Sequence, residues 1–279
     1  MAEPLLAGPK VLLIGAAGSG KTHSIGTLVD WAGAHKRNVH VLFVENGLET
    51  LLGYWTDRGL KVPDNLRYHV VTTKATPLAS LTDAAKKVGI MSYKLITEMV
   101  DPKRSDNNPY LKILEALANF PDDRTGELCG NIGEWDSSQI LCIDSLSELA
   151  NSAMKMVIGA KPTASPSDYG VSQNNLLNLL RFFTQGFSPT LVMTAHVQRQ
   201  QDEITGGVKL MVKAIGKAMA DDIPQLFSEV IGCVRDGNAW YWDTANSALD
   251  TKTRYLGIAS KIKPDFSVIM DKWAKRGSL

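Results

Sequence analysis

A glycine-rich stretch near the start of the chain has residue types and spacing that suit phosphate binding. The sequence GAAGSGKT fits the pattern G-x-x-x-x-G-K-[ST] through Gly15, Gly20, Lys21 and Thr22. Residues without a side chain let backbone N–H groups turn inward around phosphate oxygens at a helix N-terminus, where the dipole favours an anion. The lysine then reaches the β- and γ-phosphates, and the threonine hydroxyl is a ligand for Mg²⁺. The stretch therefore predicts a P-loop for ATP and Mg²⁺.

The sequence around this stretch supplies the context that a P-loop requires. The apolar run VLLIG before it predicts a buried strand, and HSIGTLVDWAGAH after it predicts a helix. A glycine-rich turn that matched the pattern by chance would need neither the strand before it nor the helix after it, so their presence favours a P-loop. The residues expected to contact the nucleotide are Gly15, Ala16, Ala17, Gly18, Ser19, Gly20, Lys21, Thr22 and His23.

Three further side chains suit the hydrolysis of ATP. Glu45 follows the apolar run NVHVLFV and is placed to polarise the attacking water. Asp144 ends the run QILCID as in a Walker B motif, on a strand expected next to the P-loop strand, and is placed to hold Mg²⁺ through water together with Thr22. His196 follows TLVMTA and is placed to contact the γ-phosphate. A strand-end acid or a single histidine can also be purely structural, so these catalytic roles depend on the P-loop beside them.

The elements that must position these side chains form an α/β fold. Apolar runs ending at the P-loop, near Glu45, at Asp144 and near His196 predict parallel strands, whose carboxyl ends share the edge where open α/β sheets bind ligands. Late in the chain, DGNAWYWDT predicts a strand and TRYLGIAS its antiparallel partner. We therefore expect a mostly parallel central sheet flanked by helices, with a late antiparallel hairpin.

Composition limits where such a protein works. The 279 residues carry 30 basic and 29 acidic side chains, so no global charge points to nucleic acid or to an acidic membrane. Cys129, Cys142 and Cys233 lack the spacing of a zinc site or a disulfide framework, which fits a reducing cytoplasm. No run of about 18 apolar residues is present, so we expect no membrane span.

The order of these motifs resembles the RecA core of strand-exchange recombinases and hexameric helicases. Over roughly residues 8–275, the segments LCIDSLSEL, LVMTAHVQRQ, KAIGKAMADDIPQLFSEVI and RYLGIASKIKPDF resemble the small RecA-core ATPases of bacteriophages, some of which are single-strand annealing proteins. The resemblance implies ATP hydrolysis, assembly into a homo-oligomeric ring or filament, and single-stranded DNA binding. A phage-encoded protein of this kind would act in the host cytoplasm.

Two segments are candidates for contact with DNA. Residues 159–170 are rich in Pro, Ser and Gly, as a mobile loop would be. Residues 199–217 are the better candidate, because they carry several bases around a Gly-Gly turn. Acids are also present there, so a surface hairpin of mixed charge is the alternative. The candidate DNA-binding residues are Arg199, Lys209, Lys213 and Lys217.

The sequence GIASKIKPDF contains two lysines with strand spacing. Residues two apart in a strand point to the same face, so Lys261 and Lys263 would project together. On their own, they would be exposed side chains at a sheet edge. The RecA resemblance implies that they extend into the ATP site of a neighbouring subunit and stabilise charge on the transferring phosphoryl group, as an arginine finger does.

Taken together, the sequence predicts one RecA-like ATPase domain over residues 1–279, with a helical and loop elaboration at about 74–135. The leading hypothesis is an ATP-dependent recombination protein that binds single-stranded DNA and promotes strand annealing or pairing. One alternative is a hexameric helicase or a packaging-type DNA motor. Another is a nucleotide-switched assembly or loading factor that does not bind DNA.

Overall fold

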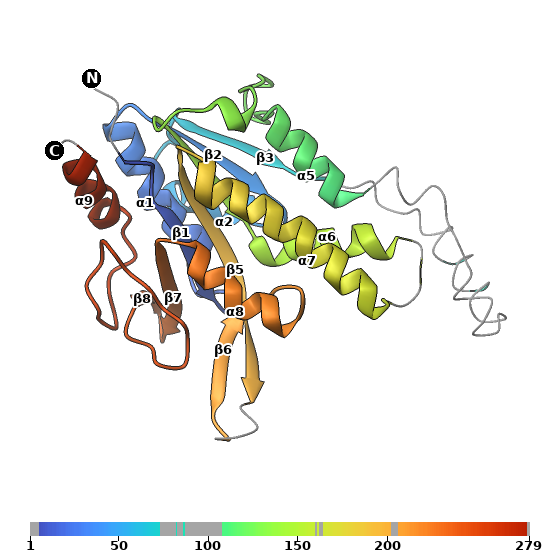
Figure 1. The fold of residues 1–279 in the computed structure, drawn as a ribbon. Coiled ribbons are helices and arrows are strands. Elements are labelled where there is room, and N and C mark those ends of the chain that lie inside the picture. The colour runs from blue at the N-terminus through green and yellow to red at the C-terminus, as the bar shows by residue number, and fades with distance from the viewer. Residues whose placement is uncertain are drawn as a thin grey trace.

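The computed structural model describes residues 6–72, 82, 86, 108–159, 161, 164–201 and 206–277. A single mixed sheet forms its centre, with strand order β3-β2-β4-β5-β1-β7-β8 and with β6 paired to β5 (Figure 1). The strands are β1 Lys10–Gly15, β2 Asn38–Phe43, β3 Leu66–Val70, β4 Gln139–Asp144, β5 Thr190–Gln201, β6 Val208–Val212, β7 Glu229–Asp236 and β8 Ala239–Asp243. Only the β5–β6 and β7–β8 pairs are antiparallel.

Helices cover both faces of this sheet. They are α1 Lys21–Ala34, α2 Leu48–Thr56, α5 Pro109–Ala118, α6 Leu146–Ile158, α7 Pro166–Arg181, α8 Gly216–Leu226 and α9 Ser267–Gly277, with short turns at Ile132–Glu134 and Phe182–Gly186. The parallel sheet, the flanking helices and the late antiparallel pair confirm the predicted fold class. Among the described residues, no helix combines the length and the apolar content that crossing a membrane requires.

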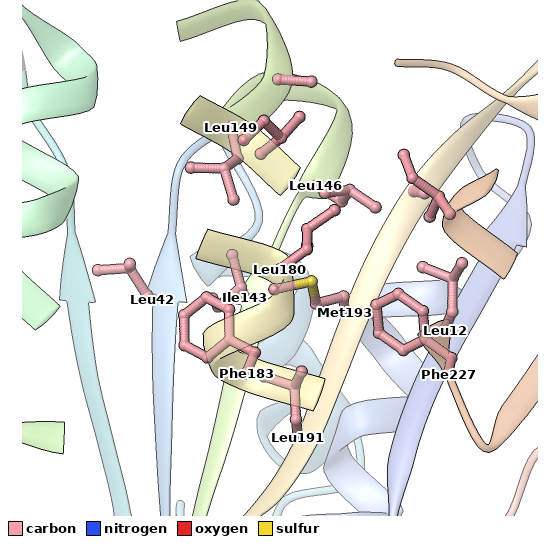
Figure 2. Close-up of a cluster of buried hydrophobic side chains, with 14 of the residues drawn as sticks. Leu12, Leu42, Ile143, Leu146, Leu149, Leu180, Phe183, Leu191, Met193 and Phe227 are labelled. Carbon is pink, nitrogen blue, oxygen red and sulfur yellow. The ribbon is translucent and has the colours of Figure 1, made fainter. Parts of the chain in front are cut away.

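The continuous apolar runs of the strands are explained by burial on two sides. On one face, Leu12, Ile143 and Met193 pack against side chains of α6 and α7 such as Leu149 and Leu180 (Figure 2). On the other face, the alternate residues of the same strands pack against α1, α2 and α9. Each strand residue therefore faces a helix layer, which is the reason that the central strands have no polar alternation.

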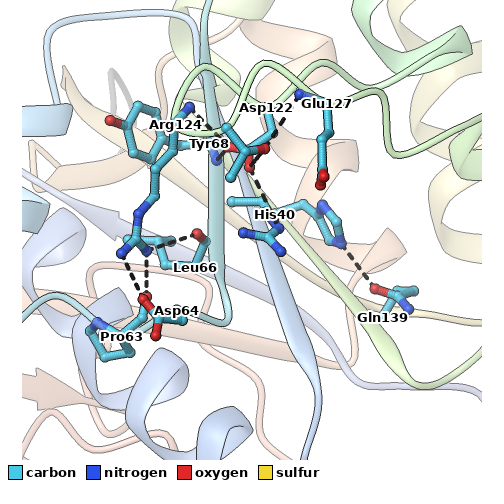
Figure 3. Close-up of polar contacts among 11 residues, drawn as sticks. His40, Pro63, Asp64, Leu66, Tyr68, Asp122, Arg124, Glu127 and Gln139 are labelled. Atoms are coloured by element: carbon cyan, nitrogen blue, oxygen red, sulfur yellow. Dashed lines mark hydrogen bonds and ion pairs between the residues drawn. The ribbon is translucent and has the colours of Figure 1, made fainter.

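The outer edge of the sheet is protected by the segment that follows α5. Asp122, which is 1% exposed, accepts a hydrogen bond from the Tyr68 N–H on the edge strand β3 at 3.3 Å (Figure 3). The Arg124 guanidinium donates to the Pro63 carbonyl at 2.6 Å and forms an ion pair with Asp64 at 3.1 Å. Side chains thus satisfy backbone groups that an open edge strand would leave unpaired.

The strand order corrects one expectation about the Walker B strand. β4 was expected to lie next to the P-loop strand β1, but β5 lies between them. Asp144 nevertheless reaches the first turn of α1, as described below. Strand adjacency is decided by packing between distant segments, which the apolar runs do not encode.

The late antiparallel pair also differs from the sequence expectation in its partner. β8 pairs with the preceding strand β7 and not with residues 253–260, which contain no strand. Two backbone contacts still join β8 to the later segment, since Thr244 N–H donates to the Ala259 carbonyl at 2.9 Å and Trp242 and Ile262 exchange hydrogen bonds. The segment TRYLGIAS is held as an irregular loop beside β8.

The expected elaboration at about 74–135 lies only partly within the described residues. Its described part contains α5, which begins at Pro109 with the Asn108 side chain accepting from the Tyr110 N–H, and the short turn at Ile132–Glu134. The helical pattern expected at 78–100 lies outside the described residues, except for positions 82 and 86. Strand β3, just before this region, was not expected, because LRYHV is only half apolar.

Candidate active site

The glycine-rich stretch forms a turn between β1 and α1 that has the backbone geometry of a P-loop. Gly18 and Gly20 have φ angles of 73° and 83°, which residues with a side chain rarely adopt. Gly15 is needed for a different reason, since a Cβ there would lie 2.5 Å from the Cys233 carbonyl oxygen of β7. The turn therefore exposes successive N–H groups at the start of α1, as anion binding requires.

Lys21 lies within this turn rather than on the surface. Its side chain is buried, and Nζ donates to the Gly15 and Ala16 carbonyl oxygens, both at 2.8 Å. Burial lowers the pKa of Lys21, and the nearby charges of Asp144 and Glu45 oppose this shift. The acids thus favour the charged ammonium that phosphate binding needs.

Asp144 lies at the carboxyl end of β4 and contacts two hydroxyl groups. Its Oδ2 accepts from Thr22 Oγ1 at 2.7 Å, and its Oδ1 accepts from the Thr194 hydroxyl. Burial raises the pKa of Asp144, while both hydroxyl hydrogen bonds oppose this shift. Gly47 leaves room for the carboxylate, because a Cβ there would lie 2.6 Å from Oδ2.

This donor set fits Mg²⁺. The ion prefers oxygen ligands and keeps several waters in protein sites. The Thr22 hydroxyl and the Asp144 carboxylate provide two such oxygens 2.7 Å apart beside the P-loop. These are the two residues that would hold the metal ion, and their role as its ligands stays a prediction.

Glu45 and His196 come together across the site. Glu45 lies two residues past the end of β2, and its Oε2 is 3.2 Å from His196 Nε2. The His196 N–H donates to Ser147 Oγ of α6 at 2.9 Å, which fixes the strand β5 at this level. Both side chains are about 30% exposed, at 31% and 29%. They line one open cleft of about 440 Å³ with residues 17–23 of the P-loop, Asn46 and Thr50.

Trp240 also lies beside the P-loop, although the aromatic run that contains it is interpreted from sequence as cross-strand packing and not as a nucleotide contact. Its Nε1 donates to the Gly18 carbonyl at 3.0 Å, and its ring lies so close to Gly20 that a Cβ there would be 2.7 Å from Cγ. The ring centroid of His23 is 4.6 Å from that of Trp240 and 5.0 Å from that of Tyr54. These three rings line a pocket of about 440 Å³ beside the P-loop, which can accept a flat aromatic ring such as a nucleobase.

A signal for Trp240 is present in the sequence but depends on the fold. In the strand AWYWD, Trp240 and Trp242 face one side of the sheet and Tyr241 faces the other. Trp242 is buried in the layer that contains α1. Because β7 lies beside β1, this side of β8 passes over the start of α1, and only the exposed tryptophan reaches the P-loop.

The two lysines of the SKIK segment lie near the same region. Lys261 Nζ forms an ion pair with Asp236 at 2.8 Å, and Lys263 lies 3.9 Å from Asp265. Their side chains are 67% and 85% exposed. Lys261 has a φ angle of 58°, so strand alternation does not describe this segment. Lys263 lines the same aromatic pocket as Trp240.

The bases proposed for DNA contact lie along the β5–β6 hairpin and at the start of α8. Lys209 forms ion pairs with Asp221 at 2.9 Å and with Asp250 at 3.0 Å, so acids neutralise its charge. Among the described residues, Arg199, Lys213 and Lys217 form no ion pair. The pairing of Lys209 with acids fits the alternative expectation, which is a surface hairpin of mixed charge.

The first candidate loop is partly helical. Within residues 159–170, the described part from Pro166 onward forms the first turns of α7. Ser165 and Asp168 form a capping box at the start of this helix, and Lys161 pairs with Asp168 at 2.7 Å. The Pro- and Ser-rich composition here serves helix initiation.

The fold and this site define an ATPase of the P-loop class. The AAA domain family matches residues 7–259, and the chain belongs to that family. No curated protein matches the sequence. Among solved structures, the chain is similar to one in the assembled ATPase EscN in complex with its central stalk EscO from the enteropathogenic E. coli type III secretion system. The two share 13% identity with a TM-score of 0.41, over 90% of this chain and 48% of that chain, so this chain spans about half its length.

Proposed function

We propose that the protein is an ATP-driven DNA recombination protein that assembles on single-stranded DNA and promotes the pairing of complementary strands. The observation that carries this proposal is the continuity of β5, which runs without a break from the nucleotide site into the hairpin. Thr194, at the level of the site, contacts Asp144, and Arg199 lies five residues further along the same strand. A change at the γ-phosphate would therefore act on the hairpin through one rigid element.

A second contact supports this coupling. The Lys213 N–H, just after β6, donates to the His196 carbonyl at 2.8 Å. His196 in turn lies against Glu45, so the base of the hairpin, where β6 ends, lies next to these two residues. Movement of His196 toward a bound γ-phosphate would shift the base of the hairpin and so couple the nucleotide site to it.

The chemistry that we assign to the site uses the residues described above. The P-loop N–H groups and Lys21 bind the phosphates, and Glu45 accepts the proton of the attacking water. When bound, Mg²⁺ would neutralise phosphate charge at Thr22 and Asp144. His196 orients Glu45 and reports the presence of the γ-phosphate.

We further propose that the active protein is a homo-oligomeric ring or filament. Lys261 and Lys263 are exposed. Lys261 pairs with Asp236 and lies 5.8 Å from the Tyr241 ring centroid, and Lys263 lies 3.9 Å from Asp265. Exposed ion pairs of this kind contribute little to stability, so they can be exchanged for contacts with another subunit. In this arrangement, the lysines of one subunit stabilise the transferring phosphoryl group in the next.

The test of the function is ATP turnover with single-stranded DNA, with duplex DNA and without polymer. Recombination activity of the proposed kind requires stimulation by the single strand and acceleration of complementary-strand annealing. Stimulation by duplex together with strand unwinding would favour a helicase or packaging motor. If neither form of DNA changes the rate of ATP turnover, the remaining candidate function is the nucleotide-switched assembly factor. The paired control is the variant Arg199→Ala with Lys217→Ala, which should lose stimulation but keep turnover without polymer.

Shared active sites are tested by mixing two inactive variants. Lys261→Ala with Lys263→Ala should bind ATP without turning it over, and Lys21→Ala should not turn it over either. In a mixture, some interfaces place an intact P-loop beside intact lysines, so activity should return. A fully active monomer, or normal turnover by the double lysine variant, would refute the shared site.

A further inference from the structure

A second basic surface lies at the other end of the chain from the P-loop. It consists of Lys252, Arg254, Lys272 and Arg276, and we call it the C-terminal basic surface. All four side chains are exposed, two on the loop after β8 and two on α9. We propose that this surface binds the phosphate backbone of nucleic acid, as a site separate from the β5–β6 hairpin.

Hydrogen bonds hold the two parts of this surface together. The Arg276 Nη2 donates to the Arg254 carbonyl at 3.3 Å, and Lys272 Nζ donates to the Tyr255 carbonyl at 2.6 Å. The Arg276 guanidinium also lies over the Tyr255 ring, 4.9 Å from its centroid. The loop and the helix α9 therefore present their bases as one surface rather than as separate flexible side chains.

The loop itself is fixed from below by a buried acid. Glu229, at the start of β7, is fully buried and accepts from the Arg254 N–H at 2.6 Å, the Tyr255 N–H at 3.2 Å and the Thr253 hydroxyl at 2.8 Å. Because these contacts use the backbone of the loop, the Arg254 side chain stays available to solvent. A preformed arrangement reduces the entropy lost when a ligand binds.

In the part of the chain that the structure describes, the exposed charges of this surface pair with no acid, although the buried carboxyl of Glu229 lies beneath the loop. Among the described residues, none of its four members forms an ion pair, whereas Lys209 on the hairpin has two. Asp271, which precedes Lys272 on α9, accepts a hydrogen bond from Trp31 Nε1 at 2.7 Å. An unbalanced group of bases attracts a polyanion, and the released counterions supply the binding free energy.

The surroundings favour nucleic acid over a membrane or a protein. Of the large apolar side chains of α9, Ile269, Met270 and Trp273 are fully buried and Val268 is 41% exposed, and on the neighbouring loop Ile258 is 82% exposed. These exposed side chains are single residues and do not form the continuous apolar face with which a helix inserts into lipid. Protein interfaces usually have an apolar core from which charges are depleted. Here the basic side chains form the exposed surface, and Tyr255 beneath them is only 8% exposed. Contacts with phosphates, without base stacking, fit this chemistry.

The surface is also connected to the hairpin by a short stretch of chain. The Leu210 N–H of β6 donates to the Ala248 carbonyl at 2.7 Å, and Lys252 exchanges backbone hydrogen bonds with Val230 of β7. The segment from 248 to 252 thus runs from the hairpin to the first base of the surface. A polymer bound at the hairpin could continue across the C-terminal basic surface, although binding there does not require the hairpin.

The experiment measures DNA binding by fluorescence anisotropy across a salt titration, without nucleotide, for a labelled single strand and for a duplex. The variant Arg254→Gln with Arg276→Gln removes two charges and leaves a polar side chain at each position. The matched control, Lys112→Gln with Lys155→Gln, removes two charges from α5 and α6 on the opposite face of the sheet. We expect the first variant to bind about tenfold more weakly and to lower the slope of log K against log salt by about two. The control should keep the wild-type curve.

The outcomes separate this proposal from the function proposed above. Equal binding by the wild type and the arginine variant, with both folded as judged by ATP turnover without polymer, would overturn the C-terminal site. A loss confined to vesicles of anionic lipid, with DNA binding unchanged, would overturn it too. If no DNA stimulates turnover but the arginine variant still loses DNA binding, the recombination function fails while the C-terminal site stands.

Discussion

Two buried lysines lie at opposite ends of the same strand and have different surroundings. Lys10 begins β1 and Lys21 follows its carboxyl end, and each side chain is 6% exposed. Lys10 Nζ donates to the carbonyl oxygens of Gly8, Phe187 and Pro189, at 3.0, 2.7 and 2.5 Å. In the part of the chain that the structure describes, no acid offsets its burial, which lowers the pKa of Lys10 to about 7. Lys21 also donates to carbonyls, but Asp144 and Glu45 lie near it.

The difference shows how the two edges of the sheet are used. At the carboxyl edge, consecutive strands end in an acid or a hydroxyl, and the charges of the site support each other. At the amino edge, the lysine joins β1 to the segment before β5 and has no reactive partner among the described residues. Burial of a lysine is thus not by itself a sign of catalysis. The carboxylates near Lys21 distinguish it from Lys10.

The largest expected effect is the loss of turnover in Lys21→Ala. Removing the ammonium should lower ATP turnover by about 1,000-fold, because it takes away a charge-stabilising donor from the phosphates. The measurement is steady-state phosphate release. Lys10→Met is the matched control at the other end of β1, and its turnover should stay near that of the wild type. If Lys21→Ala turns over ATP as fast as the wild type, the assignment of the glycine-rich stretch as a P-loop is wrong.

The next effect separates catalysis from binding within the carboxyl edge. Glu45→Gln should slow turnover by about 100-fold, because the amide cannot accept the proton of the attacking water. Nucleotide affinity, measured with a fluorescent ATP analogue, should change little since Glu45 is not part of the phosphate turn. Turnover at the wild-type rate would exclude Glu45 as the general base.

The third effect is a stability difference at the amino edge. The pKa of Lys10 is about 7 in the folded protein and near 10.5 in the unfolded chain, so the unfolded state binds more protons between these values. The free energy of unfolding should therefore rise with pH in this window, by up to about 1.4 kcal/mol per pH unit. In Lys10→Met, this rise of the free energy of unfolding with pH should be absent. The measurement is urea unfolding at roughly pH 7.5 and roughly pH 9.5, which both lie inside the window.

A surface control makes this test specific. Lys36→Met removes an exposed ammonium that is in water in both states, and it should keep the wild-type pH slope. If Lys10→Met and the wild type show the same slope, burial of the Lys10 ammonium does not govern stability in this range.

The residues of the carboxyl edge were predictable from sequence because their signals are local. The P-loop spacing is complete within eight residues, and Glu45, Asp144 and His196 each follow an apolar run. Parallel strands then bring such positions to one edge without further information. The sequence predicted that these residues lie at one edge of the sheet, and the structure brings Glu45 beside His196 and Thr22 beside Asp144 there.

What the sequence did not predict depends on contacts between distant segments. Packing between distant segments decides that β5 lies between β1 and β4. The apolar runs of these strands are too similar to predict which strands are neighbours. Lys209 looked available for DNA, but one of its acids, Asp250, lies far along the chain. Lys10 carried no motif, since its partners are backbone carbonyls that any residue provides.

The smallest expected effect concerns Trp240, which joins the carboxyl edge through the β7–β8 pair. If its ring stacks on the nucleobase, Trp240→Ala should weaken ATP binding by roughly tenfold, in the range of one base–aromatic contact. Tyr241→Ala, on the opposite side of β8, is the matched control and should bind ATP normally. The decisive comparison uses tripolyphosphate as a competitor, because it has phosphates but no base. Its affinity should not change in Trp240→Ala. An equal loss for ATP and tripolyphosphate would instead mean that Trp240 acts by holding the P-loop through the Gly18 carbonyl.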